Sequence, residues 1–140
     1  MNERGRRKSD SRRGAALVEF AVVVPVFLVF IVGMIEMGRA IMVQQLITNA
    51  SREGARVAGY ESTTQTSTVT SAVSAYLGNV NITGTTTTVS PDPPSGALDG
   101  QQVSVTVSVP YSQVSWVPSP FFLKGRTLQA TSVMRREPAP

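Results

Sequence analysis

The sequence contains no cysteine and no histidine among its 140 residues. Zinc, iron–sulfur and thiol sites therefore lose their usual ligands and nucleophiles, and a histidine-based catalytic triad is excluded. Disulfide bonds cannot brace the fold. The sequence also lacks a glycine-rich phosphate loop and a paired-carboxylate motif. We therefore expect no enzymatic activity, no metal and no cofactor.

Charged residues are few, at 16% of the chain, and they are unevenly distributed. Residues 1–13 carry six basic and two acidic side chains, a net charge of +4, whereas the remaining residues carry seven of each sign. The basic character therefore belongs to a short leader. A basic leader suits nucleic acid as well as a membrane surface, but the apolar run that follows favours the membrane. We expect no nucleic-acid partner.

The apolar run directly follows this leader. Residues 20–35 contain no charged or strongly polar side chain, and twelve of the sixteen are Val, Ile, Leu or Phe. The insertion free energies of these twelve sum to roughly −4 to −7 kcal/mol. Extending the run back to Ala15 across Glu19 gives 21 residues, enough to cross a bilayer core as a helix. Pro25 predicts a kink in this helix.

The flanks of the run predict its orientation. Arg12 and Arg13 precede it, whereas Glu36 and Arg39 balance each other on the far side. The positive-inside rule then places the N-terminus in the cytoplasm and the chain beyond about residue 40 outside. A cleaved secretory signal peptide is the alternative, but residues 35–40 offer no good small-x-small cleavage site. We expect a single-pass protein of the inner (cytoplasmic) membrane.

Glu19 is the one ionisable residue within the extended run. A carboxylate there is costly unless it reaches the headgroups or finds a partner. One interpretation places it at headgroup depth, near the arginines of the leader. The other makes it the partner of a positive charge in a second subunit. The chemistry of the residue alone leaves both open.

Helical spacing continues beyond the run, over residues 37–60. Arg52, Glu53 and Arg56 lie largely off its apolar side, and Glu53 and Arg56 are spaced to pair at i,i+3. We expect one helix from about Ala15 to about Tyr60, with an apolar stripe made of Ile41, Met42, Val43, Leu46, Ile47, Ala50 and Val57.

The rest of the chain predicts a small α+β domain with one short helix and two to three antiparallel strands. Valines alternate with Ser and Thr over residues 102–109, the clearest strand pattern in the chain. Tyr111, Trp116, Phe121 and Phe122 follow, and we expect most of them to pack in the core. The remaining segments are a linker (61–70), the short helix (69–77), a strand (79–90), a Pro/Gly loop (91–100), an aromatic segment (110–126) and a last strand (127–135).

The expected organisation is therefore a basic cytoplasmic leader (1–14), a transmembrane helix (15–36), a helix extension (37–60) and an outward-facing domain (61–140). The fold class is α+β, with a long N-terminal transmembrane helix that continues into this small domain.

The residues around the start of the apolar run, RRGAALVEF, resemble the processing site of type IV pilin-like precursors. They look more closely like the TadE-like branch of the Tad (Flp-type) pilus system, which Pro25 and the later segment NASREGAR also resemble. The resemblance implies that a prepilin peptidase cuts between Gly14 and Ala15, which makes Glu19 the family's glutamate and Phe20 the aromatic residue after it. It also places Arg52, Glu53, Gly54 and Arg56 in a block shared by the family.

Phe20, where the major pilin usually has Tyr, is similar to the minor, pseudopilin-type members. The resemblance thus implies a minor pilin or pseudopilin that supports assembly of a Tad pilus or a related secretion machine. Its partners would be membrane lipid, the prepilin peptidase and other pilin-like subunits, contacted through the N-terminal helix. This favours the interpretation of Glu19 as a partner for another subunit. It also makes incorporation into an extracellular pilus conceivable.

Two other functions remain open. The first is a permanently anchored envelope protein that uses the same N-terminal block only for insertion and partner contact. Alternatively, it is an exported domain that binds a ligand or carbohydrate and is tethered by its helix. The four aromatic residues between positions 111 and 122 are the candidates for such a binding surface.

Overall fold

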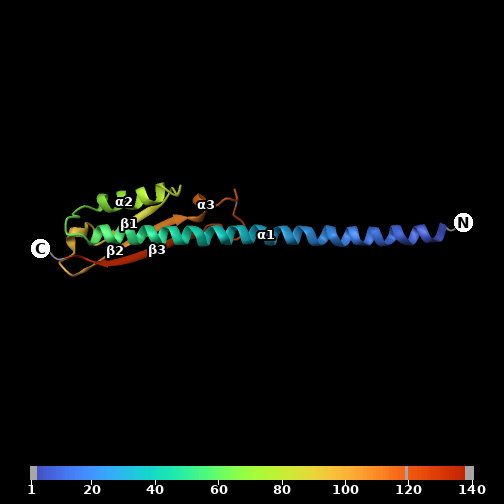
Figure 1. Ribbon diagram of the computed structural model, residues 1–140, viewed down its shortest axis with the longest axis horizontal. Coiled ribbons are helices and arrows are strands. Elements are labelled where there is room, and N and C mark those ends of the chain that lie inside the picture. The colour runs from blue at the N-terminus through green and yellow to red at the C-terminus, as the bar shows by residue number, and fades with distance from the viewer. Residues whose placement is uncertain (1–2, 119, 138–140) are drawn as a thin grey trace. The chain divides into compact units, whose positions relative to one another are not determined.

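The computed structural model describes residues 3–118 and 120–137, and for residues 3–13 it describes the backbone alone. The chain divides into two compact units, Met1–Ile35 and Glu36–Pro140. Helix α1 (Glu3–Gly59) contributes to both units, and all other elements belong to the second. Figure 1 labels these elements along the chain.

The first unit is the N-terminal part of helix α1. The helix begins at Glu3, so the sequence-based start at about Ala15 was wrong. The physical reason is that Arg, Lys and Glu, which dominate the leader, are good helix formers and no proline interrupts them. The helix continues through Pro25.

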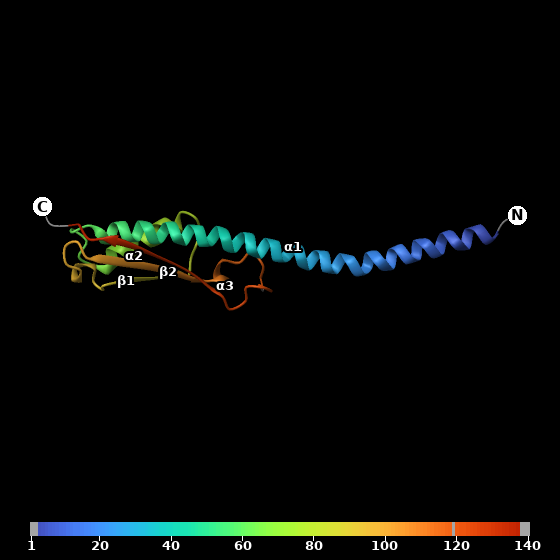
Figure 2. The ribbon, with the colours of Figure 1, turned by 90° about the horizontal axis from the view of Figure 1, so that it is seen from below.

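The second unit confirms the predicted α+β class. Its three strands form one antiparallel sheet in the order β1-β2-β3, joined to the helices within the same unit (Figures 1 and 2). The elements are α2 (Thr66–Gly78), β1 (Thr86–Ser90), the 3₁₀ helix η1 (Pro94–Gly96), β2 (Gln102–Pro110), the short α3 (Tyr111–Val114) and β3 (Thr127–Arg135).

The central strand β2 determines which face of the sheet is buried. Its alternating valines are completely buried, as the period-two pattern predicted. The register places Val105 opposite Val89 of β1 and Ser132 of β3, so the inward residues of all three strands share one face. The other face carries the hydroxyl side chains of β2. The buried valines are Val103, Val105, Val107 and Val109.

Helices α1 and α2 complete the core above this face. Val69, Val73 and Leu77 of α2 are buried at a spacing of four residues and join the same apolar cluster as the valines of β2. Ile41 and Met42 belong to the predicted apolar stripe of α1, and both are about half exposed. The buried stripe runs at helical spacing through Ala40, Val43, Ile47, Ala50, Gly54 and Ala58, which places Ile41 and Met42 off it.

Two element boundaries differ from the sequence-based prediction. Helix α2 begins at Thr66, within the segment that we expected to be a linker. Strand β1 begins at Thr86, not at Asn79. The reason is that Asn81 (φ 54°) and Gly84 (φ 71°) adopt left-handed backbone conformations, which belong to turns and not to strands.

Candidate functional site

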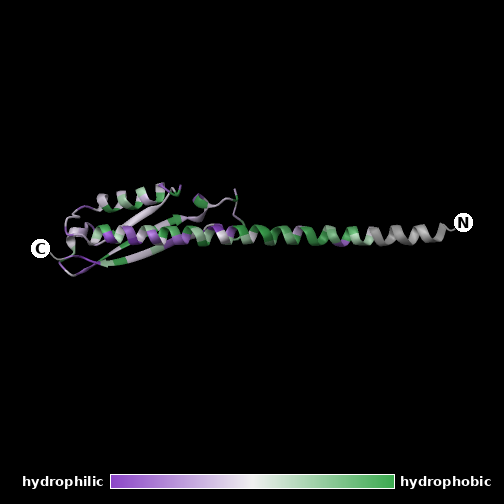
Figure 3. Cartoon of the chain, in the orientation of Figure 1, coloured by the Kyte–Doolittle hydropathy of each residue, from purple (hydrophilic) through white to green (hydrophobic). Residues whose placement is uncertain are grey.

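The apolar surface of the first unit is the main candidate for function. Large apolar side chains are exposed around the helix, including Leu17 (68%), Val26 (69%) and Phe30 (65%). Figure 3 colours most of this stretch of α1 as hydrophobic. A helix that is apolar on all sides suits a lipid environment or a bundle of similar helices, not one face of a soluble core.

The length of this helix agrees with a membrane span. Among the described residues, one helix is long and apolar enough to cross a membrane, and it falls within Gly14–Gly59. The sixteen apolar residues 20–35 and the flanking turn give the roughly 20 residues that a bilayer core requires. The predicted membrane anchor is therefore supported by both length and composition.

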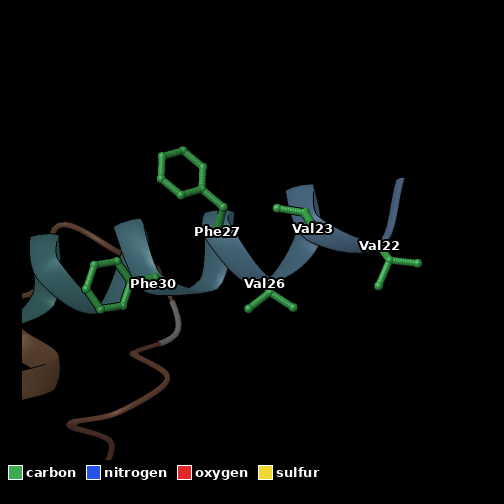
Figure 4. Close-up of a pocket in the computed structure, with 5 residues that line it drawn as sticks. All are labelled: Val22, Val23, Val26, Phe27 and Phe30. Carbon is green, nitrogen blue, oxygen red and sulfur yellow. The ribbon is translucent and has the colours of Figure 1, made fainter. Parts of the chain in front are cut away.

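An open groove on this helix is lined by apolar side chains alone. Five apolar side chains on successive turns line it: Val22, Val23, Val26, Phe27 and Phe30 (Figure 4). The lining holds no side chain that could transfer a proton or bind a metal. Such a surface can accept an acyl chain or an apolar side chain of a neighbouring helix.

The predicted processing residues lie on the exposed surface of α1. Gly14, Ala15, Glu19 and Phe20 are all helical and all exposed. Glu19 follows Ala15 by four residues, one helical turn, so its carboxylate lies on the same side of the helix as Ala15. Because the Gly14–Ala15 bond is inside a helix, a peptidase that cuts it must first unwind this turn locally. The Arg12 and Arg13 side chains are outside the described part of the chain.

A second candidate site is a cluster of hydrogen bonds around Glu36, which the sequence did not predict. This side chain is 1% exposed, and its carboxylate accepts three backbone hydrogen bonds. Oε1 accepts from the N–H of Phe121 at 2.6 Å, and Oε2 accepts from the N–H groups of Phe122 and Leu123 at 2.9 and 3.2 Å. Three donors converging on both oxygens suit an ionised carboxylate. Glu36 therefore fixes the loop between α3 and β3 to helix α1.

Two more residues attach the same loop region to α1. The Tyr111 hydroxyl donates to the backbone carbonyl oxygen of Glu36 at 2.8 Å. Tyr111 is fully buried, and this burial raises the pKa of its phenol above the ordinary value. Arg39 donates from Nε to the Val114 carbonyl oxygen at 2.7 Å, and its Cζ lies 4.8 Å from the ring centroid of Trp116. Glu36 and Arg39 were predicted only to balance each other's charge beside the apolar run, but both also bind the region between α3 and β3.

Three of the four aromatic residues in this region are exposed. Tyr111 is buried as expected, but Trp116 (65%), Phe121 (75%) and Phe122 (53%) are not, so the prediction that most would pack in the core was wrong. The reason lies in the backbone: the N–H groups of Phe121 and Phe122 face Glu36, and their side chains remain outside the core. The rings of Phe121 and Phe122 pack edge to face, with their centroids 5.4 Å apart.

The segment NASREGAR (residues 49–56) has one buried side and one exposed side. Ser51 is buried and its hydroxyl lies 2.7 Å from that of Ser132 on β3. Gly54 is buried where a Cβ atom would meet Val73 Cγ2 at 2.7 Å and Val105 Cγ1 at 3.0 Å. The absence of a side chain at position 54 therefore lets α1 approach α2 and β2.

The charged residues of the block lie on the exposed side. Glu53 and Arg56 form the predicted i,i+3 ion pair, with Nε of Arg56 3.0 Å from Oε2 of Glu53. The hydrogen bond from Arg56 lowers the pKa of the Glu53 carboxyl. Arg52 is exposed and lines a shallow polar hollow on α1 together with Gln44, Gln45, Thr48 and Asn49.

Among the side chains that the structure describes, those of residues 14–118 and 120–137, no three Asp or Glu residues are grouped to hold a metal ion. Asp92, in the Pro/Gly loop, instead accepts a hydrogen bond from the Thr66 hydroxyl at the start of α2.

Comparison with known families finds a match for the N-terminal part of the chain. Residues 14–56 match the model of a family described as TadE-like protein. No curated protein and no solved structure matches the chain. The family match confirms the TadE-like resemblance for the anchor helix and the NASREGAR block, and it suggests a protein associated with the Tad pilus. The match begins at Gly14, the residue before the predicted cut.

Proposed function

We propose that this protein is a minor pilin or pseudopilin-like subunit that supports assembly of a Tad (Flp-type) pilus or a related secretion machine. Residues 15–36 anchor it in the cytoplasmic membrane, and the same helix packs against other pilin-like subunits. The role is structural and not enzymatic. The leader of residues 1–14 lies in the cytoplasm and the domain of residues 61–140 lies outside.

One observation carries the proposal. The segment that matches the TadE-like family starts at Gly14 and continues through a helix whose apolar side chains are exposed and whose only acidic residue before Glu36 is Glu19. A pilin-like subunit needs this combination, because its helix must first stay in lipid and then pack in a bundle. The orientation is supported by the net charge of +4 in residues 1–13.

Processing gives the leader and Glu19 connected roles. Hydrolysis of the Gly14–Ala15 peptide bond leaves a carboxylate on Gly14 and a new α-amine on Ala15. It removes the whole excess positive charge of the chain, since the remaining residues carry seven basic and seven acidic side chains. The enzyme that performs this step would be a prepilin peptidase acting from the cytoplasmic side of the membrane.

The new amine gives Glu19 a partner in another subunit. In a bundle of such helices, the Glu19 carboxylate of one subunit pairs with the Ala15 amine of its neighbour. Each charge would be costly alone in a low-dielectric environment, and the pair offsets much of that cost. Because both groups are fixed on rigid helices, the pair also sets the axial register between subunits.

Glu19→Ala tests this role. We expect the variant to insert into the membrane as the wild type does, because it removes a charge from the apolar helix. Its co-purification with pilin-like subunits should fall severalfold, because the partner amine is left unpaired. Glu61→Ala is the matched control, since Glu61 is an exposed carboxylate beyond the end of helix α1.

Unchanged co-purification of Glu19→Ala would contradict the pairing and leave Glu19 as a carboxylate at headgroup depth. Equal losses in Glu19→Ala and Glu61→Ala would also contradict it, because they would indicate a general effect of charge. Membrane-bound protein that associates with no pilin-like subunit at all would favour the permanently anchored alternative.

A further inference from the structure

The exposed aromatic loop of the second unit has no role in the function proposed so far. We infer that Trp116, Phe121 and Phe122 insert into the headgroup region of an anionic lipid bilayer and form a second membrane contact in addition to the anchor helix. The inference rests on the anchoring role proposed for residues 15–36 and adds a lipid-binding surface on the folded domain.

Attachment to Glu36 determines the place of this loop. Ile35 is the last residue of the apolar run, and Glu36 is the next residue along the chain. The Glu36 carboxylate holds the backbone N–H groups of Phe121 and Phe122 at 2.6 and 2.9 Å. The loop is therefore fixed to the residue at which the chain leaves the apolar segment. If residues 20–35 span the bilayer core, this point lies at headgroup depth.

The side chains have the chemistry of a membrane interface. Trp is enriched at this depth because its ring is apolar and its N–H is polar, and phenylalanine side chains are inserted by peripheral amphipathic segments. Trp116, Phe121 and Phe122 are between 53% and 75% exposed. Because Glu36 already accepts the backbone N–H groups of residues 121–123, this part of the loop can enter the interface without leaving those donors unpaired.

The charges around the loop favour anionic lipid. Residues 111–126 contain Lys124 and Arg126, both exposed, and no acidic residue. Arg39 lies against the ring of Trp116. Each basic group near an anionic surface contributes about 1 kcal/mol of attraction. A carbohydrate site is a poorer fit, because residues 115–123 carry no side-chain carboxylate or amide to bind sugar hydroxyls.

The opposite end of the domain provides an internal control. Strand β2 runs from Gln102 to Pro110, so the loop before it and the loop after it lie at opposite ends of the sheet. Leu98 in the first of these loops is 71% exposed, as open as the three aromatic residues. Asp92, Asp99 and Glu137 lie at that end together with Arg135 and Arg136, so it carries no excess of positive charge. It should not touch anionic lipid.

Trp116 is the only tryptophan of the chain, so its fluorescence tests the inference directly. The full-length protein is reconstituted in vesicles of phosphatidylcholine and phosphatidylglycerol whose acyl chains carry bromine either near the headgroup or near the chain end. We expect bromine near the headgroup to remove most of the Trp116 emission and bromine near the chain end to remove much less. Acrylamide in the aqueous phase should quench it only weakly.

Two reporters in a Trp116→Phe background separate this inference from the anchor itself. The Phe27→Trp reporter should be quenched best by bromine near the chain end. The Leu98→Trp reporter should be quenched by acrylamide and not by bromine. If Trp116 behaves like the Leu98→Trp reporter while the Phe27→Trp reporter is quenched by lipid, the anchor stands and the second contact is overturned.

Two further outcomes would also overturn the inference. Protection of Trp116 from both bromine and acrylamide would mean that a second copy of the chain covers the loop, not lipid. Absence of bromine quenching for the Phe27→Trp reporter as well would show that residues 15–36 do not enter the bilayer, and both proposals would then fall.

Discussion

Small residues at the C-terminal end of α1 let this helix pack closely on the rest of the domain. Ala55 and Ala58 are buried, and a Cβ atom at Gly54 or Gly59 would come within 3.0 Å of a neighbouring side chain. Gly54 belongs to the block that matches the TadE-like family. Close packing against Val73 and Val105 is enough to explain a glycine at position 54. Arg52 and the ion pair of Glu53 with Arg56 lie on the surface, where a partner could reach them.

A matched pair of glycine substitutions tests the packing at Gly54. Gly38→Ala places its methyl group in open space and should stabilise the helix by about 0.5–1 kcal/mol. Gly54→Ala gains the same helix propensity, but overpacking against Val73 and Val105 costs about 1–3 kcal/mol. Thermal unfolding followed by circular dichroism should therefore give a lower melting temperature for Gly54→Ala than for Gly38→Ala. Equal stabilisation by both substitutions would contradict the close approach.

The burial and the hydrogen bonds of Glu36 could not be predicted from the sequence. Its position after an apolar run indicates a membrane flank, and nothing local indicates a buried carboxylate. Its partners are backbone N–H groups 85 to 87 residues later, which no side-chain pattern reveals. The exposure of Phe121 and Phe122 follows from the same hydrogen bonds and was equally hidden. Gly14, Ala15, Glu19 and Phe20 could be proposed as a processing site from the sequence because they belong to one short contiguous segment, and their roles stay a prediction.

At the scale of elements, helix α1 has two parts with different patterns of apolar residues. Up to Ile35 its apolar residues surround the helix, whereas from Glu36 to Gly59 the buried residues follow a narrow stripe. The sequence predicted this change because apolar periodicity is a strong signal in a long helix. It predicted β2 and β3 for the same reason, since their inward residues alternate. Strand β1 was predicted too long because β-branched residues continue through the turn at Asn81 and Gly84.

The Glu36 carboxylate binds the backbone of residues 121–123 in the loop between α3 and β3, and Glu36→Gln tests how far the order of this segment depends on it. The amide has one acceptor oxygen and an NH₂ group that would face the N–H groups of the loop. We expect the amide hydrogens of Phe121, Phe122 and Leu123 to exchange faster by about tenfold or more, because charged acceptors form the stronger hydrogen bonds. Hydrogen–deuterium exchange read by mass spectrometry measures this in the full-length protein.

Glu53→Gln is the matched control for that experiment. It also converts a glutamate of α1 to the amide, but Glu53 pairs with Arg56 on the surface and contacts no part of the loop. Protection of residues 121–123 should stay as in the wild type. Loss of protection in both variants, or in neither, would contradict the assignment of Glu36 as the residue that fixes the loop.

At the scale of the whole molecule, the proposed processing would give a precursor and a mature subunit that differ in charge. The precursor carries a net charge of +4, all of it in residues 1–13, which orients the helix during insertion. The mature chain has balanced side-chain charges and a new amine one helical turn from Glu19. In the proposed function, anchoring therefore needs only residues 15–36, whereas assembly needs the cut as well.

The N-terminus of the protein in its own cells distinguishes a processed subunit from an anchor that keeps its leader. Membrane fractions from cells with an active prepilin peptidase are analysed by intact mass and N-terminal sequencing, with the processed major pilin of the same cells as the positive control. The account predicts a chain that begins at Ala15, and a chain that begins at Met1 when the peptidase is removed. Chains that begin only at Met1, in cells that do process their major pilin, would contradict it.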